Sequence, residues 1–323
     1  MKPSVKGFFF LVGATSLWGI SGTVAKILFN QQVNPMHLVT IRLTLSFLVL
    51  LVYLALWKPH LLRVKKTDLP YLAVLGTAGI ALVQFSYLFT ISQTNVATAV
   101  FLQYLGPGIV AAYAFLFQGE RMGPAKLLAL LLTAGGGYLI VNGAPGGGLA
   151  VNLPGLVSGL VSAAALAFYT LYGKKGLSTL NPWTMLLYCF GFGALIWNIF
   201  QPPWIAMVGH SATEWYFFLY IAVFATVLPF GFYFFGLNYL TPVITGLTGT
   251  LEPVVAAVVA FLVLGEFMYP LQLVGCSMIL AGVVAIQCLP GQEEVYKIEN
   301  NISHPQPLTS HLSSGRNIEN SRE

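Results

Sequence analysis

Charged residues are scarce in this chain of 323 residues. Lys, Arg, Asp and Glu make up only 8% of it, whereas hydrophobic residues make up 57%. A soluble domain carries about 25% charged residues, so the scarcity of charge excludes an ordinary soluble protein. The hydrophobic residues stand in continuous runs and do not alternate with polar ones as in an outer-membrane barrel. The composition therefore indicates a polytopic helical membrane protein.

Residues that carry enzyme chemistry are also few. The three cysteines lack metal-site spacing, and the Gly-rich segment 143–148 lacks the lysine of a phosphate loop. Residues 19–22, Gly-Ile-Ser-Gly, match the pattern of intramembrane serine proteases, which need a histidine base at similar depth. Only His37 of the five histidines lies in a hydrophobic run, near its outer end. We therefore expect no enzyme activity, metal or cofactor.

Ten hydrophobic runs, called spans below, are each long enough for a helix to cross a bilayer core of about 30 Å. They cover approximately residues 7–29, 35–57, 68–91, 95–118, 123–143, 152–173, 182–200, 213–238, 243–264 and 269–289. Short connections rich in Asn, Pro and Gly separate them. The expected fold class is an all-α polytopic membrane protein with ten transmembrane helices.

The chain contains an internal duplication. Residues 104–124 align without gaps with residues 250–270, and 10 of the 21 aligned pairs are identical. The predicted domains are two repeats of five spans, residues 7–143 and 152–289, joined by the Gly-rich segment. Residues 290–323 are polar and without hydrophobic periodicity, which predicts a disordered cytoplasmic tail.

Basic residues indicate the orientation of the spans. With ten spans, the loops containing Lys or Arg all fall on one side of the membrane, and the loops on the other side contain neither. The basic positions are Lys2, Lys6, Lys58, Arg63, Lys65, Lys66, Arg121, Lys126, Lys174 and Lys175. Basic loops stay in the cytoplasm, so both termini are predicted there. Because five spans is an odd number, the two halves insert in opposite orientations, as in the inverted repeats of secondary transporters.

Several motifs stand out along the chain: Leu17-Trp18-Gly19, Arg42, Leu105-Gly106-Pro107 with Gly119-Glu120, and Leu251-Glu252-Pro253 with Gly265-Glu266. The last two occupy corresponding positions of the two halves and so recur in register. These motifs resemble the drug/metabolite transporter superfamily, specifically its EamA-type members with ten helices. The resemblance covers residues 7–289 and implies a central cavity lined largely by spans 1, 3, 4, 6, 8 and 9. It implies no single substrate, because similar sequences carry amino acids, other metabolites or drugs.

Three charged residues stand within the spans. Lys26 is expected to reach the external interface by snorkelling. Arg42 lies about 10 Å below the outer surface by helical rise, where it either snorkels or binds a carboxylate or phosphate. Glu252 is too deep and too short to snorkel, so we expect it to carry a proton or to bind a substrate amine. A buried carboxyl that locks helices together is the alternative for Glu252.

Polar and aromatic residues at similar depth are candidates for the cavity wall, although each also has a packing interpretation. They are Trp18 and Ser21 on the first span, Gln84 and Tyr87 on the third, Gln103 and Tyr104 on the fourth, and Tyr169 and Tyr172 on the sixth. The helix interruptions at Gly106-Pro107 and Glu252-Pro253 occupy corresponding positions of the two halves, which is typical of a transporter binding site.

The sequence thus predicts a secondary transporter in the plasma (inner) membrane, exporting small metabolites such as amino acids by alternating access. Its expected partners are a small-molecule substrate, possible coupling protons and the lipid bilayer, without nucleic acid, and its expected state is a monomer or weak homodimer. Two alternatives remain open: an uncoupled facilitator of metabolites, and a membrane receptor or sensor.

Overall fold

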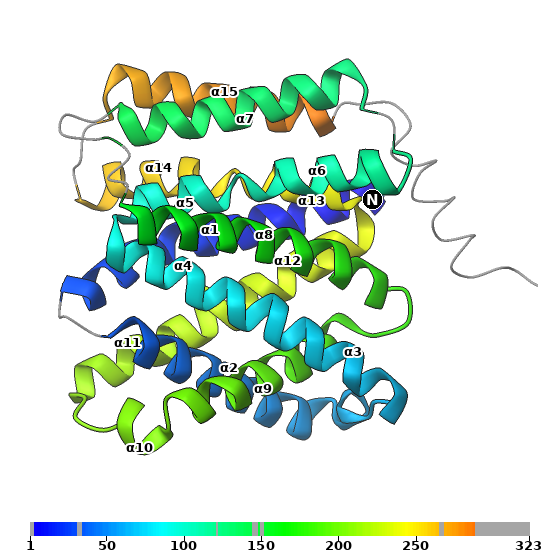
Figure 1. Cartoon of the computed structure of the whole chain (residues 1–323), viewed down its shortest axis with the longest axis vertical. Helices are drawn as coiled ribbons and strands as arrows, with labels where there is room; N and C mark the ends of the chain where they lie inside the picture. Colours follow the sequence, from blue (N-terminus) through cyan, green and yellow to red (C-terminus); the bar gives the residue numbers. More distant parts are fainter. Residues whose placement is uncertain are drawn as a thin grey trace, which may run out of the picture.

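A computed structural model describes residues 3–30, 34–120, 122–143, 148, 152–264 and 268–287. Within these residues, ten helical segments are long and hydrophobic enough to cross a membrane. They coincide with the ten predicted spans and confirm an all-α polytopic fold (Figure 1). The predicted tail, Arg121, Glu266 and the side chain of Lys26 lie outside what the structure describes.

The elements follow the same order in each half. The first half contains α1 (Pro3–Asn30), α2 (Pro35–Trp57), the short turns η1 (Pro59–Leu62) and η2 (Lys66–Asp68), α3 (Leu69–Val74), η3 (Leu75–Ala81), α4 (Leu82–Gln93), α5 (Val96–Gln103), α6 (Gly106–Phe117) and α7 (Pro124–Asn142). The second half contains α8 (Leu153–Gly176), α9 (Pro182–Phe200), α10 (Pro203–Ala206), α11 (Ala212–Ala222), η4 (Val223–Val227), α12 (Leu228–Tyr239), α13 (Pro242–Gly249), α14 (Glu252–Leu264) and α15 (Pro270–Gln287).

The fourth and ninth spans are interrupted at equivalent positions. The fourth breaks between α5 and α6, and the ninth between α13 and α14. Pro107 and Pro253 have no backbone N–H, so the carbonyls four residues earlier, at Gln103 and Gly249, lose their helical partners. Those two residues are the last of α5 and α13. The prolines therefore place each break where the repeat predicts it.

The third and eighth spans each contain a π-helical segment, η3 and η4. The helices that follow, α4 and α12, begin at Leu82 and Leu228 and occupy equivalent positions of the repeat. In η4 the Thr226 hydroxyl donates to the Ile221 carbonyl at 2.9 Å, five residues back. Such π-helical turns often occur at functional sites.

The two halves are packed through each other. The third span of each half lies on the first span of the other, since α4 contacts α8 and α12 contacts α1. The second spans, α2 and α9, contact each other, as do the fifth spans, α7 and α15. Figure 1 shows α7 and α15 as a pair at one end of the long axis, with α2 and α9 toward the other end.

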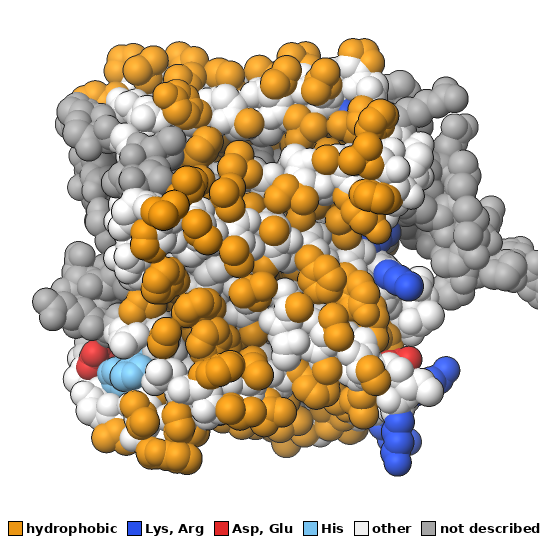
Figure 2. Space-filling view, viewed as in Figure 1, with side chains coloured by type: hydrophobic (Ala, Val, Ile, Leu, Met, Phe, Trp, Pro, Cys, Tyr) orange, Lys and Arg blue, Asp and Glu red, His pale blue; other side chains and the backbone are white. Residues whose placement is uncertain are grey.

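The surface carries the polarity expected of a membrane protein. Hydrophobic side chains cover the face drawn in Figure 2, between its two lateral edges. The Lys and Arg side chains on this face lie toward the right-hand edge, where Figure 1 marks the N-terminus.

Candidate functional site

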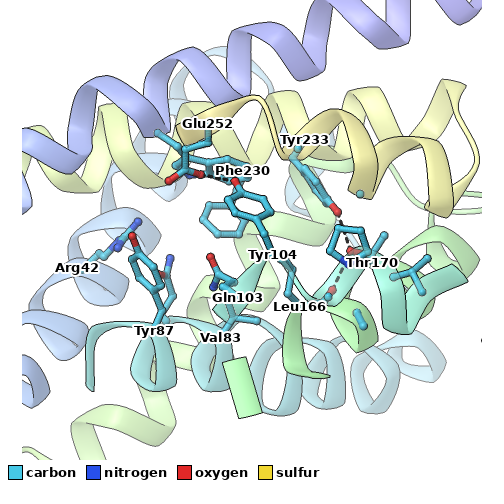
Figure 3. Close-up of a pocket in the computed structure, with 18 residues that line it drawn as sticks. Arg42, Val83, Tyr87, Gln103, Tyr104, Leu166, Thr170, Phe230, Tyr233 and Glu252 are labelled. Carbon is cyan, nitrogen blue, oxygen red and sulfur yellow. Dashed lines mark hydrogen bonds between the residues drawn. The ribbon is translucent and has the colours of Figure 1, made fainter. Parts of the chain in front are cut away.

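A cavity lies between the two halves (Figure 3). Its volume is about 70 Å³, several times the ~10–15 Å³ that one water needs. Its lining residues are Trp18, Arg42, Val83, Gln84, Tyr87, Gln103, Tyr104, Gly106, Pro107, Val110, Leu166, Ala167, Thr170, Phe230, Tyr233, Gly246, Gly249 and Glu252. These residues come from the six spans that the family resemblance implied, and Arg42 adds the second span.

Glu252 lies where the two interrupted helices meet. It begins α14, and its Oε2 accepts a hydrogen bond of 2.6 Å from the Tyr104 hydroxyl. Tyr104 itself lies in the break between α5 and α6. Gly19 lets α1 approach α14 closely, because a Cβ at this position would lie only 2.9 Å from the Val255 Cβ. The hydrogen bond between Tyr104 and Glu252 thus connects the two breaks, and Glu252 lines the cavity.

Arg42 is anchored to η4. Its Nε donates to the Thr226 Oγ1 at 2.6 Å and its Nη2 to the Ala225 carbonyl at 2.7 Å. That carbonyl is free because Pro229, four residues later, has no N–H to offer it. The indole N–H of Trp18 donates to the same carbonyl at 3.2 Å. Arg42 is 8% exposed, so it does not snorkel to the interface, and its anchoring is a structural role beside any role in binding.

The two predicted glutamines differ in their bonding. Gln103 donates from its Nε2 to the Ser162 hydroxyl at 2.8 Å, which ties α5 to α8. Gln84 is 3% exposed, and its Nε2 has no hydrogen-bond partner among the described residues. Tyr87 comes from the same helix as Gln84 and is drawn beside Arg42 in Figure 3. Gln84 therefore carries an unused donor at the wall of the cavity.

The two charges of the cavity do not neutralise each other directly. In the part of the chain that the structure describes, ion pairs join Lys126 to Glu120 and His210 to Glu214, and none joins Arg42 to Glu252. A charge inside a membrane span is costly, by about 2.5–3.5 kcal/mol on insertion scales, and usually marks a functional site. A guanidinium group and a carboxyl group thus line the same cavity without pairing with each other.

Sequence reasoning missed a second polar pair at the cavity. Thr170 Oγ1 and the Tyr233 hydroxyl form a hydrogen bond of 2.6 Å, and Phe230 lies nearby on the wall. The repeat contains a signal that could have found two of these residues. Tyr233 and Phe230 are the counterparts of Tyr87 and Gln84 when the alignment of residue 104 with residue 250 is extended to the third span.

Three predicted residues lie outside the cavity wall. Ser21 is buried on α1, and its hydroxyl has no partner among the described residues. Tyr169 is fully buried and stacks on Phe234 with ring centroids 4.8 Å apart. Tyr172 stacks on Tyr71 at 4.5 Å, and its carbonyl accepts the Tyr71 hydroxyl bond. The other seven predicted residues, Trp18, Arg42, Gln84, Tyr87, Gln103, Tyr104 and Glu252, are brought together at the cavity.

Comparison with known proteins points the same way as the geometry. The EamA-like transporter family matches residues 5–142 and 153–287. The chain is 28% identical over 290 residues to the uncharacterized inner membrane transporter YicL of Salmonella typhimurium, over 88% of this chain and 96% of that protein. It is 30% identical over 279 residues to the threonine/homoserine exporter RhtA of Escherichia coli (strain K12), over 84% of this chain and 87% of that protein. One crystal structure shares the fold, with a TM-score of 0.73 at 17% identity over 90% of this chain and 98% of that one.

Proposed function

The chain belongs to the EamA-like transporter family, and from that premise we propose that it exports small metabolites, amino acids or related compounds, by alternating access. The family and the relatives indicate a transporter and not an enzyme. The ten hydrophobic helices of the described residues, with the inner-membrane relative, indicate a multi-pass protein of the inner membrane.

The cavity is the observation that carries this proposal. It lies where the two interrupted helices meet, and it combines polar groups with a largely hydrophobic wall. Interrupted helices at corresponding positions of two halves are the usual surroundings of a transporter substrate. Arg42 and Glu252 each contribute a charge that would be costly in the membrane without a function.

The proposed mechanism of access rests on two inverted repeats, residues 7–143 and 152–289, with both termini in the cytoplasm. Support comes from the basic loops, from the two family matches that follow the same division, and from the reciprocal packing of α4 on α8 and α12 on α1. Rocking of one half against the other would open the cavity to each side of the membrane in turn.

The direction and substrate class follow the relatives and the site. RhtA is named as an exporter of threonine and homoserine, and the cavity has room and polar partners for a solute of that size. Glu252 is proposed to couple export to proton entry, because a buried carboxyl can bind a proton on one side and release it on the other. An uncoupled facilitator is the alternative.

Purified protein in liposomes tests the transport function. Liposomes that contain the protein are loaded with a panel of labelled polar metabolites, including the proteinogenic amino acids. They should release at least one of these compounds faster than protein-free liposomes loaded in the same way. Binding without flux for every compound would favour the receptor alternative and reject the proposal.

Single cysteines in a cysteine-free background test the inverted arrangement. In intact cells, an impermeant thiol reagent added outside should label cysteines at Gln93 and Gly147 and leave those at Lys65 and Lys175 unlabelled. Permeabilised cells provide the control, because all four positions should then react. Labelling of Lys65 from outside would reject the inverted repeat.

A further inference from the structure

Gln84 carries a donor that the protein itself does not use. Its side chain is 3% exposed and lines the cavity, and its Nε2 has no partner among the described residues. A buried amide N–H without an acceptor is costly, so it calls for a partner from outside the protein, such as a bound water or a ligand. The matching group on a ligand is an oxygen, and a carboxylate oxygen makes the stronger bond.

Arg42 adds a positive charge to the same cavity. A guanidinium has five N–H groups in a planar fork, and the bonds to Thr226 and Ala225 engage only Nε and Nη2. Those bonds fix the orientation of the fork, while Arg42 still lines the cavity. The remaining donors are suited to a carboxylate, because a guanidinium group can bind both carboxylate oxygens through two parallel hydrogen bonds.

Glu252 supplies the opposite charge on another wall. Figure 3 shows its carboxyl with Tyr104, apart from Arg42 and Tyr87. The Tyr104 hydroxyl takes one acceptor position on Oε2, and an ionised carboxylate has about four. The free positions can accept bonds from an ammonium group.

From these placements we infer that the cavity selects zwitterions, with the ligand carboxylate at Arg42 and Gln84 and the ligand ammonium at Glu252. This inference rests on the proposed transport function and names the substrate class. A ligand with both charges matches both walls, whereas a ligand with one charge leaves a buried protein charge without a partner. The rest of the ligand faces the hydrophobic wall formed by Val83, Val110, Leu166 and Phe230.

Two sets of three compounds test this selection. The first is threonine, its decarboxylated form isopropanolamine and its deaminated form β-hydroxybutyrate. The second is leucine with isoamylamine and isocaproate. Binding to the full-length protein in nanodiscs is measured by the thermal stabilisation that each compound produces. Flux is measured by counterflow in liposomes. In at least one set, we expect the amino acid to bind about ten- to a hundred-fold more tightly than the amine or the acid, which is the range for a lost charged hydrogen bond.

Two variants assign the ends of the ligand. Glu252→Gln should bring the acid to within a few-fold of the amino acid, because the ammonium then has no charged partner. Gln84→Met should reduce the preference for the amino acid over the amine about tenfold and leave the ratio of the amino acid to the acid unchanged. Each result is a ratio between ligands measured in one variant, so it does not depend on the yield of folded protein.

Thr98→Val is the matched control. The Thr98 hydroxyl is also buried without a partner among the described residues, but Thr98 does not line the cavity, so the ligand ratios of the wild type should persist. If, in both sets, the amine or the acid binds the wild type as tightly as the amino acid, the inference is overturned. If the wild type transports only singly charged or uncharged metabolites, the transport function stands and the inference fails. If it transports nothing, both fail.

Discussion

The two helix breaks have the same architecture and different chemistry. The break in the first half is flanked by Tyr104 and Gly106, and the equivalent break in the second half by Thr250 and Glu252. Proline follows Gly106 and Glu252 alike, so the backbone is interrupted in both copies. Only the second copy carries a carboxyl, and only the first carries the tyrosine that binds it. The duplication thus preserves the geometry, and the differences between the copies create the site.

A similar contrast holds where the second span of each half packs on a π-helical segment. Asn34 and Asn181 cap α2 and α9 alike, so Arg42 and Cys189 occupy equivalent positions. At Cys189 the backbones nearly touch, because a Cβ at Gly76 of η3 would lie 2.7 Å from the Cys189 carbonyl oxygen. At Arg42 a long side chain crosses to η4 instead. One contact is pure packing, and the other brings a charge to the cavity.

Arg42→Lys tests the contact between Arg42 and η4, and we expect it to reduce substrate affinity more than any other variant proposed here. Lysine keeps the charge but loses the fork that bonds Thr226 and Ala225 and can also hold a carboxylate. We expect the apparent affinity for the substrate to fall about ten- to a hundred-fold, since charged hydrogen bonds contribute about 1.5–3 kcal/mol. Liposome flux against substrate concentration measures this change. Cys189→Ala is the control and should leave the affinity unchanged, while normal kinetics in Arg42→Lys would remove Arg42 from substrate binding.

Gly106→Ala probes the packing of the first break. A Cβ at Gly106 would lie 3.1 Å from the Ala163 carbonyl oxygen, whereas one at Gly108 would meet no atom within 4 Å. Overpacking typically costs about 1–3 kcal/mol, so the alanine at position 106 should lower the thermal unfolding temperature in detergent. Gly108→Ala should keep or raise it, because alanine is the better helix former. Equal temperatures for the two variants would contradict the close approach of α6 to α8.

Glu252→Gln separates the chemistry of the two breaks from their shape. Glutamine keeps the size of the side chain but cannot titrate. If each exported molecule exchanges for one proton, a pH gradient of one unit can drive about tenfold accumulation, or about 1.4 kcal/mol. The variant should show none, while the wild type should respond in liposomes with an imposed gradient. A wild type that ignores the gradient would rule out coupling at Glu252 and favour the uncoupled facilitator.

Tyr104→Phe tests the difference between the two breaks, and we expect it to change substrate affinity only slightly. It removes the hydrogen bond to Glu252, and an ordinary hydrogen bond contributes about 0.5–1.5 kcal/mol, or about two- to tenfold in affinity. Thr250→Val is the equivalent change in the second half. The Thr250 hydroxyl bonds only locally, to the Leu247 carbonyl at 2.6 Å, so this variant should transport normally. If Thr250→Val reduced flux more than Tyr104→Phe, the site role would belong to Thr250 and not to Tyr104.

The spans and the breaks could be predicted from the sequence, because the length of a hydrophobic run and the position of a proline determine helix structure within the same segment. Arg42 and Glu252 could be predicted as well, because charges in a membrane span are conspicuous. Sequence reasoning could not orient the sixth span. A helix that is hydrophobic all round shows no periodicity to identify the face toward the cavity. Tyr169 therefore looked like a wall residue but belongs to the aromatic core, whereas its neighbour Thr170 lies on the wall.

The bonds of Arg42 have a consequence for how the protein is made. Its partners Thr226 and Ala225 come 184 and 183 residues later in the chain. At about 5–20 residues per second of synthesis, Arg42 leaves the ribosome roughly 10–40 s before the carbonyl and hydroxyl that will bind it. During that interval the guanidinium must be accommodated by water, lipid headgroups or the insertion machinery. The assembly of the second half is thus the step that draws this charge into the interior.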